Sequence, residues 1–228
     1  MKTNISTRMK QYEQTFKHHL IKKLPVIIRL DGKTFHSFTK QIKAQKPYDN
    51  NLKEAFNQTI KSIFNEIHNL KFVYQQSDEV SLLLTDYEKI ETEPYLNNNI
   101  QKITSITSSI FTTYFNKYIN QSVNAYFDCR CFNLPKEEVV NYFIWRQQDA
   151  TRNSISSFAQ SLFSHKRLQG LNQKELQFIM LMEKGFNWNE TETWKKRGIS
   201  TYKIDRNIIT DENIPIFTQN REYIQQFI

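Results

Sequence analysis

Residues 71–84 read KFVYQQSDEVSLLL, and the predicted fold is built around them. Two runs rich in aromatic, β-branched and other apolar residues flank the polar triplet Gln76-Ser77-Asp78, a spacing typical of a tight β-hairpin. The chain therefore contains two antiparallel strands joined by a turn that carries a carboxylate.

A strand and a helix are predicted on either side of this hairpin. Residues 24–30 (LPVIIRL) predict a strand, and residues 50–69 carry apolar side chains at a helical period. Residues 103–119 (ITSITSSIFTTYFNKYI) predict an amphipathic helix in spite of their β-branched residues, and residues 124–132 (NAYFDCRCF) predict another strand. The resulting order, β-α-β-β-α-β, is the ferredoxin-like arrangement, an α+β fold with helices on one face of an antiparallel sheet.

The remainder of the chain is predicted to be mostly helical. Three further helices begin at residues typical of helix N-termini, namely Pro135, Asn172 and Asn189. Gly185 ends the second of these helices. We therefore expect a catalytic sheet domain in residues 1–134 and a helical extension in residues 135–228, packed together as one compact unit. The segment after about residue 205 receives no role.

Composition narrows the classes of function. The 228 residues are 39% hydrophobic and 14% aromatic, which is enough for a substantial core. The net charge of +8 favours a polyanionic partner such as nucleic acid, although a lysine-rich composition bias is an alternative source of that charge. The four glycines are scattered, so neither a Walker loop nor a dinucleotide fingerprint is present, and metal ions are the obvious substitute for such a phosphate cradle.

The compartment is predicted from weaker signals. Cys129 and Cys131 are expected to be buried reduced thiols, which fits an intracellular protein. No apolar run reaches membrane-spanning length, so no membrane partner is expected. The first ten residues, MKTNISTRMK, lack the apolar core of a secretory signal, while their Thr, Ser and basic residues leave a mitochondrial address open. We expect a cytoplasmic location.

Asp31 and Asp78 are the residues best suited to carry chemistry. Asp31 ends the first strand in the stretch VIIRLDGKTF, and Asp78 lies in the hairpin. In the predicted fold these strands are neighbours, so the two carboxylates can meet at one edge of the sheet and hold two Mg²⁺ ions. The Asp-Gly step also leaves the Gly32 carbonyl accessible to a metal. The competing explanation is that both acids only mark turns, and spacing alone does not exclude it.

Seven motifs taken together resemble the tRNA-His guanylyltransferase family. In chain order they are VIIRLDGKTFHSF, KPYDN, QSDEVSLLL, FDCRCFNLP, YFIWRQQDATRNS, RLQG and WKKRG. The resemblance as a whole runs from about residue 10 to residue 203. The resemblance implies a polymerase-palm catalytic domain that adds nucleotides to the 5′ end of tRNA in the 3′–5′ direction. It also implies a homotetramer.

The resemblance further implies a reaction and the residues that perform it. ATP adenylylates the tRNA 5′-monophosphate, and the 3′-hydroxyl of an incoming nucleotide, typically GTP, then attacks that end and expels AMP. Asp31 and Asp78 would be catalytic and, with Gly32, would bind two Mg²⁺ ions. The residues implied to hold the nucleotide are Asp31, Gly32, Lys33, Thr34, Phe35, His36, Lys46, Asp49, Ser77 and Asp78. Lys46 and Asp49 would contact the triphosphate or order their loop.

Two departures from the family pattern bear on the substrate. Tyr48 stands where the family usually has Asn, and Thr151-Arg152-Asn153-Ser154 stands where the eukaryotic enzymes carry H-I-N-N. Loss of that His and of the second Asn resembles the guanylyltransferase-like subgroup, whose role is template-dependent repair of 5′-truncated tRNAs. Repair is therefore the expected function, with addition of one G (G-1) to tRNA-His as the alternative. A noncatalytic tRNA-binding module and a nucleotide cyclase are two further hypotheses that the sequence leaves open.

Basic and polar residues of the C-terminal part are the candidates for tRNA contact. They are Arg146, Arg152, Asn153, Lys166, Arg167, Lys196 and Arg197. Neutralised phosphates supply most nonspecific RNA affinity, although a solvated helix face explains any single basic residue equally well. Trp145 is predicted to be a core residue, Glu79 to lie outside the acid pair as a supporting residue, and Asp128 to be structural or a nearby acid.

Overall fold

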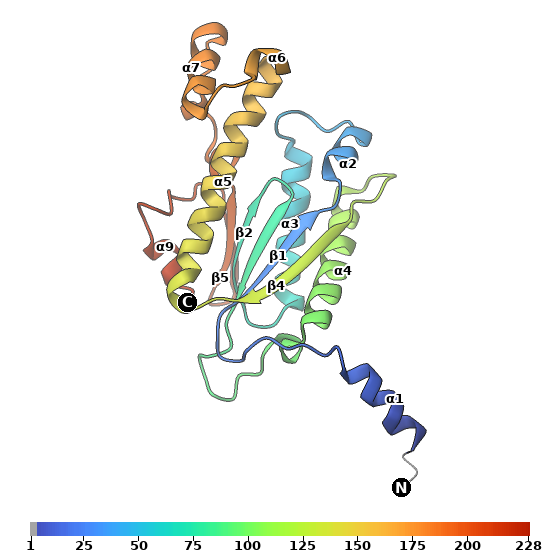
Figure 1. Ribbon diagram of the computed structural model, residues 1–228. Helices are drawn as coiled ribbons and strands as arrows, with labels where there is room; N and C mark the ends of the chain where they lie inside the picture. The colour runs from blue at the N-terminus through green and yellow to red at the C-terminus, as the bar shows by residue number, and fades with distance from the viewer. Residues whose placement is uncertain (1–3) are drawn as a thin grey trace.

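A single antiparallel sheet organises the computed structural model, which describes residues 4–228. Its six strands lie in the order β4-β1-β3-β2-β5-β6 (Figure 1). The strands are β1 (Val26–Gly32), β2 (Leu70–Gln76), β3 (Glu79–Leu84), β4 (Phe127–Asn133), β5 (Ile199–Ile204) and β6 (Asn207–Asp211). The α+β class is confirmed, and the first four strands alternate with two helices in the order β1-α3-β2-β3-α4-β4.

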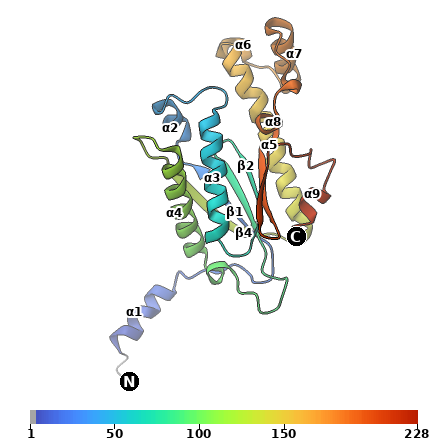
Figure 2. The same ribbon diagram turned by 180° about the vertical axis from the view of Figure 1, so that it is seen from behind.

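Helices α3 (Asn50–Glu66) and α4 (Ile100–Ile119) cover one face of the sheet (Figure 2). The Asp49 carboxylate caps α3 by accepting hydrogen bonds from the backbone N–H groups of Asn51 and Leu52. Apolar side chains of both helices and of β1, β2 and β3 form one core on this face, and many of them are completely buried. This face of the sheet is therefore a continuous hydrocarbon layer.

Helix α5 (Lys136–Leu162) packs on the opposite face. It begins directly after Pro135 and carries Glu137 and Glu138 in its first turn, where acidic side chains stabilise a helix N-terminus. Val139 and Phe143 belong to a second core with Ile27, Phe72, Tyr74 and Leu83 of the sheet. The second half of α5 extends beyond the sheet (Figure 1).

The C-terminal part of the chain is not entirely helical, and in this the expectation of a helical extension in residues 135–228 was incomplete. Strand β5 pairs with β2 and strand β6 pairs with β5, so residues 199–211 extend the same sheet. Ile214, Phe217 and Ile224, the last of which lies in helix α9 (Glu222–Gln225), are completely buried in the second core. Much of the tail that received no role from the sequence thus completes the core under α5.

Two short helices project with the end of α5 away from the sheet (Figure 1). They are α6 (His165–Leu168) and α7 (Gln173–Lys184). The predicted cap of α7 is present as a reciprocal pair of hydrogen bonds between Asn172 and Glu175, and Gly185 ends the helix in the left-handed conformation. The short helix expected at Asn189 is two pieces, a 3₁₀ turn η2 (Trp188–Glu190) and helix α8 (Thr193–Arg197).

Three smaller elements complete the chain. Helix α2 (Phe35–Gln41) follows β1, the 3₁₀ turn η1 (Tyr95–Asn98) precedes α4, and helix α1 (Ile5–Gln14) projects away from the body (Figure 1). Over residues 4–228, no helix combines the length and the apolar character needed to cross a membrane.

Candidate active site

The turn between β2 and β3 brings Asp78 to the end of β1. Ser77 and Asp78 form a two-residue loop, and Ser77 has a positive φ of 50°, as such tight hairpins require. In the ladder between β1 and β3, Asp31 lies opposite Glu79, so Asp78 stands one position further on, beside Gly32. The backbone N–H of Gly32 donates a hydrogen bond of 3.2 Å to the Asp78 carbonyl oxygen. The structure thus brings Asp31 and Asp78 together, as the topology predicted.

Gly32 is needed for space at this position. A Cβ atom on Gly32 would lie 2.6 Å from Cδ2 of Phe35 and 2.8 Å from Oδ2 of Asp78. The Asp78 carboxylate therefore rests directly against the backbone of the Asp-Gly step. Its position and that of the Phe35 ring both depend on the missing side chain.

Three acids form a row across the sheet. Asp31 of β1 lies opposite Glu79 of β3 on one side and opposite Asp128 of β4 on the other, so their side chains share the face that α5 packs against. Burial, and then repulsion by Asp128, raises the pKa of the Asp31 carboxyl above its usual value. The pKa of Asp78 is also raised, first by burial and also by the nearby Asp31. The site therefore concentrates negative charge that a cation would neutralise.

Arg146 pairs with Glu79, the buried member of the acid row. Its Nε donates a hydrogen bond of 2.7 Å to Glu79, and its Nη2 donates one of 2.7 Å to Asp149. Both Arg146 and Glu79 are buried. The prediction that Arg146 contacts a tRNA phosphate does not fit this burial, because its guanidinium is already used to pair two carboxylates.

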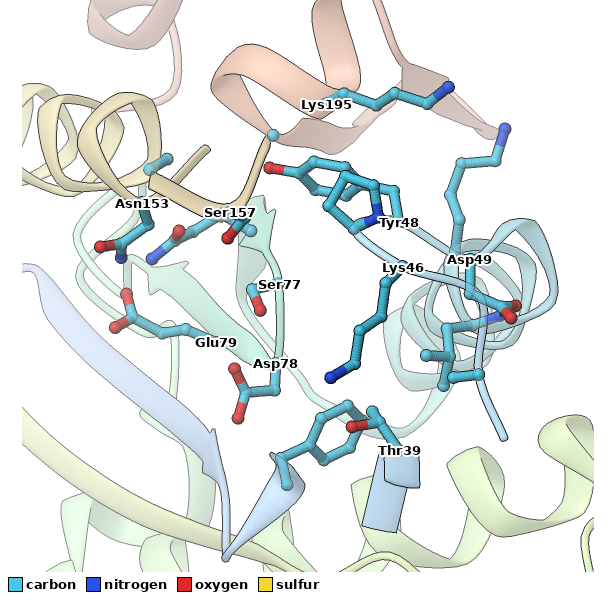
Figure 3. A pocket seen from close by; sticks show the side chains of 18 of the residues that line it. Thr39, Lys46, Tyr48, Asp49, Ser77, Asp78, Glu79, Asn153, Ser157 and Lys195 are labelled. Atoms are coloured by element: carbon cyan, nitrogen blue, oxygen red, sulfur yellow. The ribbon is translucent and has the colours of Figure 1, made fainter. Parts of the chain in front are cut away.

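A cleft of about 980 Å³ opens beside Asp31 and Asp78. Its walls come from α2, the loop before α3, the β2–β3 turn, α5 and α8. Figure 3 shows the ammonium group of Lys46 directed toward Asp78, with Ser77 and Thr39 nearby. Of the residues implied to hold a nucleotide, the cleft is lined by Asp31, Phe35, His36, Lys46, Asp49, Ser77 and Asp78. A lysine and a pair of acids around one cleft suit a polyphosphate bound with cations.

The other implied nucleotide residues lie outside the lining of the cleft. Lys33 and Thr34 are exposed, and Thr34 has a positive φ of 49° where the chain turns from β1 into α2. Gly32 acts through its backbone, as described above. Phe35 lines the cleft but is mainly a core residue, since its ring packs against Phe38, Phe56, Phe115 and Phe127.

Asp49 orders the loop that carries Lys46. Besides capping α3, its carboxylate accepts a hydrogen bond of 2.7 Å from the backbone N–H of Gln45. The next residue toward Lys46, Tyr48, packs against Phe158 of α5 and Trp194 of α8, with ring centroids 5.4 and 5.5 Å apart. Tyr48 thus joins the two sides of the cleft, a role that sequence reasoning missed although the departure from the family pattern marked this residue.

The remaining candidates for tRNA contact fall into two groups. Lys196 is buried and donates a hydrogen bond of 2.6 Å to the Asn189 carbonyl, and Arg197 donates one of 3.2 Å to the Ile214 carbonyl. Both side chains therefore bond backbone carbonyls within the protein. For Lys196, which is also buried, this does not fit the predicted contact with a tRNA phosphate. The exposed candidates are Arg152, Asn153, Lys166 and Arg167. Arg152 and Arg167 pair with Asp149 and Glu183, and Asn153 lines the cleft (Figure 3).

Sequence reasoning also assigned the wrong environment to Trp145. Its side chain is 49% exposed, and the guanidinium of Arg146 lies 4.2 Å from the centroid of its ring. The expected core residue is therefore a surface residue, whereas its neighbour Arg146 is buried. The cysteines do lie partly buried as free thiols, with the pKa of Cys129 raised to about 12 by burial.

The acid pair fits a magnesium ion in the nature of its donors. Carboxylates of Asp31 and Asp78 and the carbonyl of Gly32 are hard oxygen ligands of the kind Mg²⁺ takes. Among residues 4–228 no three or more His, Cys, Asp or Glu side chains are grouped as a metal site. Two carboxylates are nevertheless enough for Mg²⁺, which usually retains water and binds substrate phosphates. The raised pKa values of both acids are consistent with a site that gains by holding a cation.

Comparison with solved structures places the fold among proteins that bind nucleotides. The chain is 45% identical to a bacterial tRNA(His) guanylyltransferase (Thg1)-like protein in complex with ATP, with a TM-score of 0.95 and 99% of each chain covered. It is 41% identical to a bacterial Thg1-like protein in complex with GTP, with a TM-score of 0.85 and 98% of each chain covered. Fold and site together define a nucleotidyltransferase.

Sequence comparison gives the family. The family model described as tRNAHis guanylyltransferase (Thg1) matches residues 6–135. The tRNA(His) guanylyltransferases of Candida glabrata and Saccharomyces cerevisiae are 29% and 28% identical, over 85% and 84% of this chain and 90% and 89% of theirs. The chain belongs to the tRNA(His) guanylyltransferase family, whose reaction is 3′–5′ nucleotide addition.

Proposed function

We propose that this protein restores missing nucleotides at the 5′ ends of truncated tRNAs, adding them in the 3′–5′ direction as the opposite strand of the acceptor stem specifies. The observation that carries this proposal is the segment Thr151-Arg152-Asn153-Ser154 of α5, which stands where the resemblance places H-I-N-N. The higher identity to bacterial Thg1-like proteins than to the two yeast guanylyltransferases supports the same subgroup.

The surroundings of this segment support a loss of base recognition there. The Thr151 hydroxyl donates a hydrogen bond of 3.0 Å to the Gln147 carbonyl within the helix. The Ser154 hydroxyl is buried and accepts a hydrogen bond of 3.0 Å from Nε1 of Trp188. Both hydroxyls are therefore used inside the protein. Of the four, only Arg152 and Asn153 have exposed side chains, and both of these also donate a hydrogen bond to Asp149.

The residues of the cleft would act by positioning and charge neutralisation. In the proposed sequence, the 5′-monophosphate of the tRNA attacks the α-phosphorus of ATP and pyrophosphate leaves. The 3′-hydroxyl of the incoming nucleotide then attacks the activated 5′-phosphate, and AMP leaves. Lys46 would bind the triphosphate, and Asp31 and Asp78 would hold two Mg²⁺ ions. Bound there, magnesium would neutralise developing negative charge on the phosphates and lower the pKa of the attacking hydroxyl.

Several finer features belong to the same proposal. We propose that the β1-α3-β2-β3-α4-β4 unit corresponds to a polymerase palm and that residues 1–134 form the catalytic domain. ATP and GTP are proposed as substrates because the similar bacterial structures are complexes with these nucleotides. A homotetramer and a cytoplasmic location remain proposals from the resemblance and from composition.

Addition of one G to tRNA-His is the second candidate function. It is favoured by the family model and by the yeast relatives, all of which are described as tRNA(His) guanylyltransferases. Membership of a nucleotidyltransferase family leaves no support for the noncatalytic module or the cyclase.

A competition assay separates the two candidates. Purified protein, Mg²⁺, ATP and the four nucleotides are supplied with a 5′-monophosphorylated tRNA that lacks its first nucleotide and with an intact tRNA-His. We expect restoration of the truncated end by whichever nucleotide the opposite base specifies, changing when that base is changed. Selective addition of one untemplated G to tRNA-His would establish the second candidate instead. No addition to either substrate would contradict both.

A further inference from the structure

On the face of the sheet that α5 packs against, no helix of residues 4–228 lies over β4. Figure 1 shows α5 over the β2 and β5 side of the sheet, whereas nothing lies in front of β4. The side chains of β4 show the same difference: Asp128 and Arg130 are exposed, while Ser81 of β3, which faces α5, is completely buried. On this face β4 is therefore open to solvent at Asp128 and Arg130, beside the acid row.

Arginines occupy this open face beside the acids. Arg29 of β1 and Arg130 of β4 lie opposite each other in the ladder, one pleat away from Asp31 and Asp128. Both lower the pKa of Asp31, against the larger effect of burial, so they lie within electrostatic reach of it. Arg130 uses Nη2 to pair with Asp128 at 3.1 Å, and in residues 4–228 no further hydrogen bond of its side chain is present. Nε of Arg29 is buried and has no partner there.

Trp145 borders the same face from α5. The Arg146 guanidinium covers its ring at 4.2 Å and Tyr142 packs against it with centroids 5.9 Å apart, so the indole is held firmly although half of it is exposed. Arg146 in turn bonds Glu79, the neighbour of Asp31 in the acid row. Tyr142 also packs against Phe132 of β4, with ring centroids 5.8 Å apart, which places Trp145 on the β4 side of α5. A fixed, exposed aromatic ring beside a strand that carries an exposed arginine is a combination with which proteins bind single-stranded nucleic acid.

The cleft and the open face approach the acids from different sides. The cleft is lined by Asp31, Glu79 and Asp149 but not by Trp145 or Arg130. A cleft of about 980 Å³ suits a nucleotide, whereas an uncovered strand at the sheet edge admits a polymer. A reaction that joins a nucleotide to an RNA end needs both substrates at the same acids.

We propose that Trp145 and Arg130 form a docking face for the RNA substrate, in which Trp145 stacks on an unpaired base near the 5′ end and Arg130 binds a backbone phosphate. This inference rests on the proposed function for its choice of RNA as the ligand. Trp145 and Arg130 are binding residues here, and neither takes part in the transfer of the phosphoryl group.

Binding is measured with an RNA that cannot react. An acceptor-stem hairpin with a 5′-hydroxyl and unpaired terminal bases is labelled, and its binding is followed by anisotropy without ATP. Trp145→Ala is expected to weaken binding by about 10-fold, as loss of one stacked base does, and Trp145→Phe by less. Arg130→Gln is expected to reduce the salt dependence by about one phosphate contact. RNA should quench tryptophan fluorescence in the wild type more than in Trp145→Phe.

Two matched variants control for general effects. Phe178→Ala removes another exposed aromatic ring, from α7, and Arg206→Gln removes another exposed positive charge, from the β5–β6 turn. Both should leave affinity unchanged within about twofold, far below the loss expected for a stacked base. Equal affinity of the folded Trp145→Ala protein and the wild type would overturn the inference. So would a change in oligomeric state without a change in RNA affinity, because Trp145 would then contact a second copy of the chain.

The inference and the proposed function fail in distinguishable ways. If the wild-type protein adds nucleotides but substitution of Trp145 and Arg130 leaves its RNA affinity unchanged, only the docking face is contradicted. Wild-type protein that binds the hairpin through Trp145 yet adds no nucleotide would keep the docking face and remove the proposed function.

Discussion

The two faces of the sheet are built from the same strands but from different chemistry. Toward α3 and α4, Ile28, Leu30 and Val80 are completely buried in a core that contains no ion pair among the described residues. Toward α5, the alternate positions of the same strands carry Asp31 and Glu79. Because successive residues of a strand point to opposite faces, one sequence can specify a dry core and a charged site at once.

This difference shows where stability and function come from. Burial of apolar surface on the α3/α4 face stabilises the fold without regard to any ligand. On the α5 face, desolvation raises the pKa of Asp31 and Glu79, so these carboxylates are held in a state that costs free energy. Burial of the larger apolar cluster on the opposite face offsets part of this cost.

The largest expected effect is the loss of activity when a carboxylate of the acid pair, Asp31 and Asp78, is replaced. Asp78→Asn should lower the rate of nucleotide addition by about 10³-fold, because a neutral amide cannot replace a carboxylate that holds a cation at the reacting phosphates. The thermal midpoint should change little, since Asp78 is only partly buried and makes its backbone contact through its carbonyl. Single-turnover addition to a 5′-truncated tRNA measures the rate. Asp128→Asn is the control, since Asp128 is exposed and pairs with Arg130.

A second prediction tests the claim that burying carboxylates on the α5 face costs folding free energy. Arg146→Ala should lower the free energy of unfolding by about 3–5 kcal/mol at neutral pH, because Glu79 would remain buried without its cation. Replacing both residues, as Arg146→Met with Glu79→Leu, should recover most of that loss. Urea unfolding measures both variants.

The control for this prediction lies on the same helix. Arg152 also pairs with Asp149 but is exposed, so Arg152→Ala should cost no more than about 1 kcal/mol. Equal effects of Arg146→Ala and Arg152→Ala would show that burial of the Glu79 pair does not matter, and the contrast between the two faces would lose its energetic basis.

The first four strands, the two helices between them and the acid pair could be predicted from sequence far better than the last two strands and the side-chain environments on α5. The hairpin at Ser77, the helices α3 and α4 and the meeting of Asp31 with Asp78 all follow from periodicity and topology. Strands β5 and β6 were missed because they are short and polar, and because β2, which β5 pairs with, lies more than a hundred residues earlier in the chain.

Side-chain environment on α5 was the other failure. Arg146 was expected to be exposed and Trp145 buried, because residue type was given more weight than position. The helical period of Val139, Phe143 and Ala150 includes residue 146 and leaves out residue 145, so a signal for both was present. What the period could not show is that Glu79 lies on the facing strand, where it accepts a hydrogen bond from the guanidinium.

A third prediction concerns the space between the acids. Gly32→Ala should lower nucleotide addition by about 10²-fold, because a methyl group 2.8 Å from Oδ2 of Asp78 must displace that carboxylate. Gly170→Ala is the matched control: it has φ of +82° and nothing within 4 Å, so it adds backbone strain without a contact. Both variants are assayed for addition and for unfolding. Full activity of Gly32→Ala would mean that the position of Asp78 is not critical.

The smallest expected effect is a dependence of the free energy of unfolding on pH and on Mg²⁺, through the carboxyls of Asp31 and Asp78. Burial raises the folded-state pKa of Asp31 and Asp78 above the ordinary 3.8. The folded protein then holds protons that the unfolded chain has already released, so without metal the free energy of unfolding should fall as pH rises through the range just above 3.8. Mg²⁺ at ten times its dissociation constant should return about 1.4 kcal/mol near neutral pH.

Thermal unfolding with and without Mg²⁺, at matched ionic strength, measures this linkage. Asp78→Asn removes one of the two titrating carboxyls, so it should flatten the pH dependence and reduce the gain from Mg²⁺ together. Asp128→Asn leaves both titrating carboxyls in place and should keep most of the gain from Mg²⁺, while the pH dependence should lose only the part that repulsion by Asp128 contributes to the raised pKa of Asp31. A magnesium effect that survives Asp78→Asn would place the cation elsewhere, and the charged face would then need another explanation for the cost of burying its acids.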